Sequence, residues 1–176
     1  MNIFILNTGR CGSTTFIKAC QHISNFSAAH ESRCTLIGEQ RLSYPENHIE
    51  ADNRLSWILG RLDQVYGDNA FYVHLSRDKN TTAESFARRN NFGIMKAYRE
   101  GIFFQETQND SALELAQDYI ETVESNIALF LKGKTHTLSF SLENAEQDFR
   151  KFWTSINAEG DLEAALSEWN TSYNAS

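Results

Sequence analysis

The first twenty residues constrain the fold most strongly, because they combine an apolar run, a turn with two glycines and a helical pattern in immediate succession. Residues 2–7 have the length and composition of a short buried strand, and residues 8–12 have those of a turn. Residues 13–20 begin a pattern of helical spacing. The N-terminus is therefore expected to fold as a strand, a tight loop and a helix.

The loop has the features of an anion site. Gly9 and Gly12 permit backbone angles and close approaches that a β-carbon obstructs, so successive loop amides can turn inward around an anion. The first turn of the following helix adds N–H donors and the positive end of the helix dipole. Its side chains Ser13, Thr14 and Thr15 add hydroxyls. The stretch predicts a bound phosphate or sulfate.

Two well-known phosphate loops do not match this one. The nucleoside-triphosphate loop requires Gly-Lys-Ser/Thr after a glycine and four residues, but Thr14 stands five residues past Gly9 and no lysine follows Gly12. The tyrosine-phosphatase loop requires an arginine six residues past its cysteine, where this chain has Ile17 after Cys11. The lysine that contacts the β- and γ-phosphates of ATP is therefore missing.

The composition favours one globular domain with a small partner. The chain has 176 residues, 41% of them hydrophobic, and a single proline, which suits one domain over residues 1–176. A net charge of −7 without a basic run argues against a nucleic-acid surface, although a local positive pocket can lie inside an acidic protein. No apolar run approaches the length of a signal-peptide core or membrane span, so we expect a cytoplasmic protein. The cysteines and histidines show no metal-ligand spacing.

Strand and helix patterns alternate along the rest of the chain. The expected further strands are residues 26–30, 71–75 and 138–142. The expected further helices are residues 55–65, segments up to about 104, residues 111–131, a helix through 149–156 and one through 162–169. Residues 32–50 are polar and are predicted to form a long surface loop. The fold class predicted is α/β, a P-loop-like three-layer fold with a mainly parallel sheet flanked by helices.

A second motif follows the strand at 71–75. Arg77 stands at its carboxyl end, and Ser85 lies eight residues on, in a predicted helix. Ligands of open α/β sheets bind at the carboxyl ends of the strands, and a guanidinium can bind a phosphate in two places. Ser85, two helical turns onward, can contact the same anion. Arg77 and Ser85 could therefore bind one anion together.

Together the two motifs resemble those of the sulfotransferases that use 3′-phosphoadenosine 5′-phosphosulfate (PAPS). Residues 10–14, Arg-x-Gly-Ser-Thr, resemble the family's 5′-phosphosulfate loop, and Arg77 with Ser85 resembles its 3′-phosphate site. Residues 138–144 look like its late strand and acidic turn. Lys79 stands where the family usually has proline after Arg-Asp.

The resemblance implies transfer of a sulfuryl group from PAPS to a hydroxyl acceptor, without a metal. The implied donor-binding residues are Arg10, Cys11, Gly12, Ser13, Thr14, Thr15, Arg77 and Ser85. Arg10 would also be catalytic, by stabilising charge on the oxygen that bridges sulfur and the leaving phosphate. Thr15 replaces the adenine-stacking tryptophan of the animal cytosolic enzymes, and their glycine-rich, lysine-bearing C-terminal segment is absent. The chain therefore looks more like the bacterial and carbohydrate-type branches, and its adenine contacts stay open.

The acceptor must lose a proton, so a base is expected in the cleft. The Arg-x-Gly-Ser-Thr branch tends to use glutamate, which favours Glu31, at the end of the strand at 26–30. His30 is the next candidate, and Glu39 and His48 are the loop-borne alternatives. Alternation along a strand predicts that only one of Glu31 and His30 faces the donor.

Several alternatives stay open. The chain could be a P-loop phosphotransferase acting on a nucleotide or small molecule, or a non-catalytic nucleotide-binding protein on the same fold. Cys11, at a helix N-terminus, could be an acidic thiol, although a small residue between Arg10 and Gly12 is the better interpretation. The acceptor, a small molecule or a carbohydrate, cannot be identified from the sequence. The variable segment at residues 32–50 would contact this acceptor.

Overall fold

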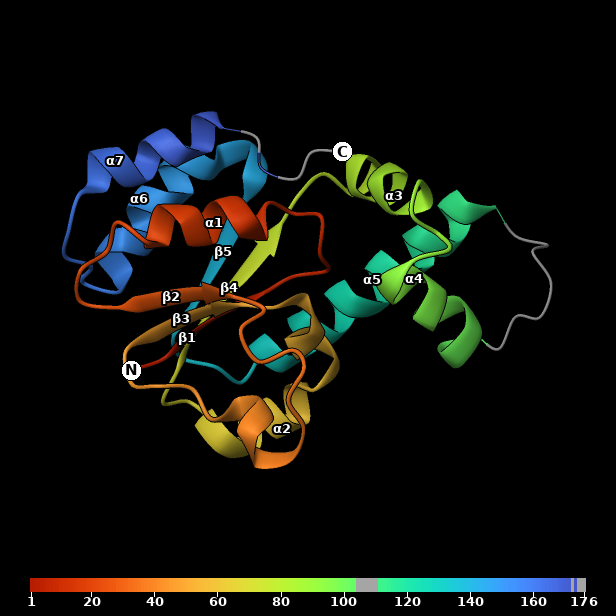
Figure 1. Ribbon diagram of the computed structural model, residues 1–176, viewed down its shortest axis with the longest axis horizontal. Helices are drawn as coiled ribbons and strands as arrows, with labels where there is room; N and C mark the ends of the chain where they lie inside the picture. The colour runs from red at the N-terminus through yellow and green to blue at the C-terminus, as the bar shows by residue number, and fades with distance from the viewer. Residues whose placement is uncertain (104–110, 172, 174–176) are drawn as a thin grey trace.

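The computed structural model describes residues 1–103, 111–171 and 173 of the chain (Figure 1). The strands of these residues form one sheet in the order β2-β3-β1-β4-β5, and every neighbouring pair is parallel. The strands are β1 (Ile3–Leu6), β2 (Ser27–His30), β3 (His48–Ala51), β4 (Phe71–Ser76) and β5 (Thr137–Ser141). The predicted α/β class with a parallel sheet flanked by helices is confirmed.

The described helices lie in two layers on either side of this sheet, with α3 and α4 beyond the carboxyl ends of its strands. The α-helices are α1 (Ser13–Cys20), α2 (Leu59–Tyr66), α3 (Lys79–Ala87), α4 (Gly93–Ala97), α5 (Ala112–Leu131), α6 (Ala145–Ser155) and α7 (Leu162–Ser167). Shorter turns are the 3-10 segments η1 (Gly38–Leu42), η2 (Asn53–Trp57), η4 (Leu142–Asn144) and η5 (Glu168–Asn170) and the π-helical turn η3 (Tyr98–Ile102). None of the described helices is both long enough and apolar enough to cross a bilayer.

Both faces of β1 are buried, which places this strand at the centre of the core. Ile3 and Ile5 belong to the apolar cluster that lies under α1, α6 and α7. Phe4 and Leu6 point the other way, into the cluster formed with α2, α3 and α5. A strand covered on both faces needs apolar residues without polar alternation, which explains the continuous run in the sequence. The result is the three-layer arrangement seen in Figure 1.

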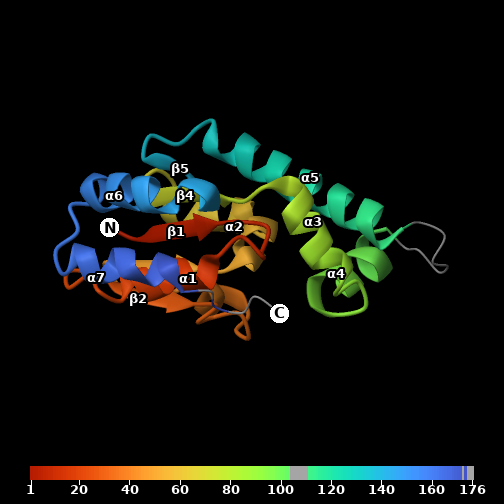
Figure 2. The ribbon, with the colours of Figure 1, turned by 90° about the horizontal axis from the view of Figure 1, so that it is seen from above.

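The chain leaves the sheet in opposite directions after two neighbouring strands. The connection from β1 passes through α1 to the edge strand β2, whereas that from β4 passes through α3, α4 and α5 to β5 at the other edge. Such a divergence opens a crevice at the carboxyl ends of the two strands, where ligands of open α/β sheets bind. Figure 2 shows α3 and α4 lying beyond this end of β1.

The prediction of a surface loop over residues 32–50 is wrong at its C-terminal end, where β3 begins. This strand lies between β1 and β2, and all four of its residues are buried. The sequence pattern did not indicate a strand here because two of its residues are polar. In the structure these polar side chains are paired. His48 Nε2 lies 3.0 Å from Glu50 Oε2, and Glu50 Oε1 accepts a hydrogen bond of 2.7 Å from the amide of Ser32. Buried polar groups with such partners are tolerated in a core.

The remaining elements agree with prediction apart from their ends. The expected helix at 55–65 begins only at Leu59, after the 3-10 turn η2, and Leu142 opens the turn η4 instead of ending β5. Helix α5 begins at a capping box formed by Ser111 and Glu114, and its inward face is buried apart from the partly buried Phe130.

Leu62 provides a test of this packing. It is the buried residue of α2 and is fully inaccessible, whereas Leu129 on α5 is 67% exposed. We expect Leu62→Ala to lower the free energy of unfolding by about 2–5 kcal/mol, through lost burial and a residual cavity. The matched Leu129→Ala change should stay within about 0.5 kcal/mol of the wild type. Urea denaturation followed by tryptophan fluorescence measures both, and equal losses would contradict the packing described.

Candidate functional site

The backbone of the loop after β1 is held in an unusual conformation. Gly9, Arg10 and Gly12 have positive φ angles of 90°, 61° and 85°, which are rare for a residue with a β-carbon such as Arg10. Asn7 Oδ1 accepts a hydrogen bond of 2.8 Å from the amide of Gly9. A β-carbon at Gly12 would come within 2.8 Å of the Leu142 side chain, so both conformation and space favour glycine there. The predicted tight loop is present.

The N-terminus of α1 faces a cavity at the carboxyl ends of the strands. Gly12 is the N-cap and supplies no side-chain cap, and the first helical turn contains no acidic residue. The positive end of the helix dipole therefore acts toward the cavity without a local carboxylate to neutralise it. Ser13, Thr14 and Thr15 all line the cavity wall, as the anion-site prediction requires.

The cavity has a volume of about 860 Å³, within the range of small-molecule sites. Its lining comes from the loop after β1, from α1, from the ends of β2 and β4, and from α3, α4 and the chain after α7. Among the described lining residues Glu31 is the one carboxylate, against the arginines Arg10, Arg54, Arg77, Arg88 and Arg89. A strongly positive cavity therefore lies in a protein whose net charge is −7.

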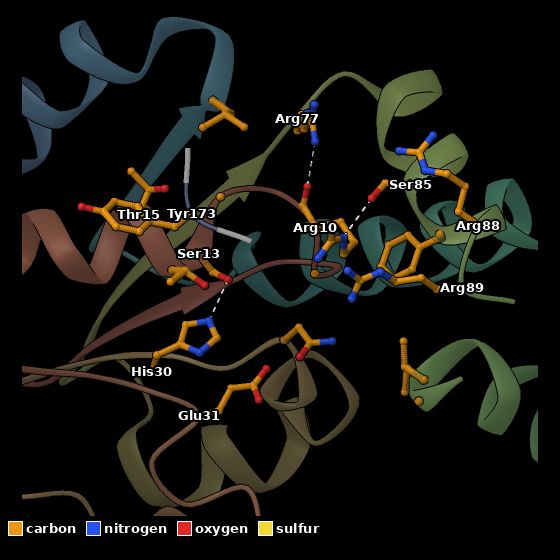
Figure 3. A pocket seen from close by; sticks show the side chains of 18 of the residues that line it. Arg10, Ser13, Thr15, His30, Glu31, Arg77, Ser85, Arg88, Arg89 and Tyr173 are labelled. Atoms are coloured by element: carbon orange, nitrogen blue, oxygen red, sulfur yellow. Dashed lines mark hydrogen bonds between the residues drawn. The ribbon is translucent and has the colours of Figure 1, made fainter. Parts of the chain in front are cut away.

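The two predicted anion sites lie side by side (Figure 3). Arg10 Nε donates a hydrogen bond of 2.9 Å to Ser85 Oγ, and Arg77 Nη1 donates one of 3.3 Å to the backbone oxygen of Arg10. Burial is the largest cause of a lowered pKa at the Arg10 guanidinium, and the charges of Arg89, Arg77 and Arg88 lower it further in that order. Residues that are 75 positions apart in the sequence thus meet at one site.

His30 and Glu31 both line the cavity, whereas strand alternation predicted that only one of them would face the donor. Strand β2 ends at His30, and Glu31 has a left-handed φ of 52°, which removes it from the alternation of the strand. His30 Nε2 lies 2.9 Å from Ser13 Oγ, and Glu31 Oε2 lies 3.0 Å from Arg54 Nη1. Figure 3 shows both side chains below the loop after β1.

The two loop-borne base candidates lie elsewhere. His48 begins β3 at the amino end of the sheet, is 5% exposed, and makes hydrogen bonds to Ser27 and Glu50. Glu39 is exposed on η1. Neither belongs to the described lining of the cavity. For His48 the reason is that parallel strands present only their carboxyl ends to the cavity.

Cys11 points away from the cavity and into the core under α1. Its side chain is 1% exposed, and Sγ lies 3.1 Å from Thr8 Oγ1 and donates to the backbone oxygen of Gly9 at 3.1 Å. Burial raises the pKa of this thiol to about 11. The alternative of an acidic thiol is therefore wrong. The backbone of Cys11 is part of the loop, but its side chain does not face the cavity.

Sequence reasoning missed several cavity residues. Arg88 and Arg89 follow Ser85 at helical spacing on the same face, a signal that was available in the sequence. Asp52 caps η2 by accepting from the amide of Arg54, and the two side chains that follow it, Asn53 and Arg54, also line the cavity. No sequence pattern indicated Trp169 or Tyr173, which the C-terminal part of the chain contributes to the cavity lining.

The comparisons with known proteins agree with this geometry at the level of the fold. The chain superimposes on the sulfotransferase domain from the curacin biosynthetic pathway with a TM-score of 0.65, covering 92% of this chain and 75% of that domain. The chain has a sulfotransferase-type fold. At 15% identity the likeness shows the fold alone. Neither the scan against protein-family models nor the search of curated proteins gives a match.

Cysteine labelling tests the description of the loop. With a thiol pKa of about 11, Cys11 is protonated at pH 8, and burial closes it to reagents. We expect iodoacetamide at pH 8 to modify the partly exposed Cys34 in the native protein, and Cys11 only after denaturation. Peptide mapping by mass spectrometry measures the two rates. Labelling of native Cys11 as fast as that of Cys34 would contradict the buried orientation.

Proposed function

We propose that the protein is a sulfotransferase that moves a sulfuryl group from PAPS to a hydroxyl acceptor. The observation that carries the proposal is the 2.9 Å contact between Arg10 and Ser85, which joins two anion sites within one cavity. A 3′,5′-bisphosphorylated nucleotide needs two such sites at short range. The sulfotransferase-type fold supports the same conclusion.

The donor's 5′-phosphosulfate would lie against residues 10–15. There the side chain of Arg10, the backbone of Cys11 and Gly12, and the hydroxyls of residues 13–15 surround the N-terminus of α1. Loop amides and a helix N-terminus bind such anions without the lysine of an ATP loop. The 3′-phosphate would lie between Arg77 and Ser85, beyond β4. This division uses every residue that the sequence assigned to donor binding.

The chemistry requires positioning and charge stabilisation more than covalent participation of the protein. The acceptor oxygen forms a bond to sulfur while the bond from sulfur to the bridging phosphate oxygen breaks. Negative charge then grows on the bridging oxygen, where Arg10 stabilises it from the loop. The proton of the acceptor hydroxyl passes to a base on the opposite side, at the end of β2.

We propose Glu31 as that base, with His30 as the alternative. The resemblance of the loop implies a glutamate, and Glu31 lines the cavity. His30 lies closer to the donor loop, because its Nε2 is 2.9 Å from Ser13 Oγ, whereas Glu31 pairs with Arg54 at 3.0 Å. The acceptor would be a small molecule or a carbohydrate that enters beside these two residues.

Ligand binding tests the donor assignment. Adenosine 3′,5′-bisphosphate should raise the melting temperature more than ADP or AMP at equal concentration. At one hundred times its Kd the stabilisation should reach about 2.7 kcal/mol. Arg77→Ala should remove most of this preference, because the 3′-phosphate loses its guanidinium. Arg150→Ala, which removes the same charge from an exposed position on α6, is the matched control. Equal stabilisation by ADP, or a strict magnesium requirement, would favour a phosphotransferase.

Sulfate transfer tests the base. The protein is incubated with PAPS carrying labelled sulfate and a panel of hydroxyl acceptors, and products are measured by mass spectrometry. Glu31→Gln keeps the shape of the side chain and removes its basicity, so it should lower turnover about a hundredfold or more with bisphosphate affinity retained. His30→Asn should have this effect instead if the roles are reversed. Wild-type turnover in both variants would refute both assignments.

A further inference from the structure

Two arginines at the C-terminal end of α3 have no role in the donor assignment above. Arg88 and Arg89 stand three and four residues past Ser85. Arg88 keeps helical angles of −63° and −15°, and the amide of Arg89 donates a hydrogen bond of 2.8 Å to the backbone oxygen of Phe86. The helical turn thus continues through both residues. Positions that are three and four apart share a helix face, and all three side chains line the cavity.

Several positive charges act together in this part of the cavity. Arg89, Arg77 and Arg88 all act on the guanidinium of Arg10, whose pKa they lower. The carboxylate of the described lining, Glu31, pairs with Arg54 at the other end of the site. In the described part of the chain, neither Arg77 nor Arg88 has an ion pair with a carboxylate. Such a gathering of like charges opposes folding and favours a bound anion.

The arrangement matches a phosphate that is held from two sides. Figure 3 shows Arg88 and Arg77 on either side of Ser85, with Arg89 extending toward Arg10. Arg77 comes from the end of β4, while Arg88 and Arg89 come from the end of α3. Guanidinium groups bind phosphate oxygens through paired N–H donors, and two of them can share one phosphate.

We propose that Arg88 and Arg89 bind the 3′-phosphate of the donor beside Ser85, and that they determine the specificity for a bisphosphorylated over a monophosphorylated nucleotide. The inference rests on the proposed function, which supplies the identity of the second anion. It adds two specificity residues that lie outside both sequence motifs. A ligand without the 3′-phosphate would gain no contact with Arg88 and Arg89, which is the basis of the discrimination.

Isothermal titration with adenosine 3′,5′-bisphosphate and with AMP tests the proposal. The variants are Arg88→Ala, Arg89→Ala and the double change. The double variant should weaken bisphosphate binding by about tenfold to a hundredfold, the effect of lost hydrogen bonds to a charged group. AMP affinity should change by less than about threefold, because its phosphate lies at the loop after β1. Arg88→Lys keeps the charge but loses the paired donors, so it should fall between wild type and Arg88→Ala.

The matched control is the double change Arg61→Ala with Arg150→Ala, which removes the same charge from two exposed positions outside the described cavity lining. It should leave the ratio of the two affinities unchanged. An unchanged ratio in the Arg88/Arg89 variant, or an equal loss for both ligands, overturns the proposal while the proposed function stands. If the wild type itself binds AMP as tightly as the bisphosphate, the proposed function fails and the inference with it. Circular dichroism of each variant checks that it is folded.

Discussion

The site depends on how the backbone of one loop is held. Three backbone carbonyl oxygens just after β1 accept hydrogen bonds from distant elements. Ser56 Oγ donates to Asn7 at 3.0 Å, and the Tyr119 hydroxyl of α5 donates to Thr8 at 2.7 Å. The side chain of Arg77 donates to Arg10. A loop with left-handed residues is strained in isolation, and these contacts hold it in one conformation. The anion site is therefore built by three parts of the chain and not by its own motif alone.

Electrostatics gives the second constraint. The cavity concentrates arginines in a protein with an excess of acidic residues. Burial and neighbouring arginines disfavour the charged form of Arg10, which means that part of the folding free energy is spent on holding the group in place. An anionic ligand reverses this cost, so binding and stability are expected to be coupled at this site. Preorganised positive charge is also what a reaction with a developing oxyanion requires.

The residues of the proposed donor side could be placed in one cavity from the sequence, because they lie at fixed positions relative to local elements. Arg10 precedes α1, Ser13 begins it, and Arg77 directly follows β4, so all three lie at the carboxyl ends of parallel strands. The acceptor side could not be predicted in this way. Whether His30 and Glu31 face the cavity depended on one backbone angle at Glu31, and a period-2 pattern contains no information about where a strand stops.

The sequence by itself determined the α/β class, the order of most elements and the two anion motifs, because these follow from local hydrophobic period, glycine positions and short spacings. It did not reveal β3, since its His48 and Glu50 are polar and become acceptable in the core only when they pair with each other and with Ser32. Only the tertiary structure decided that Cys11 turns into the core and that Arg10 reaches Ser85. Those outcomes depend on contacts between residues far apart in the chain, and no local pattern encodes such contacts.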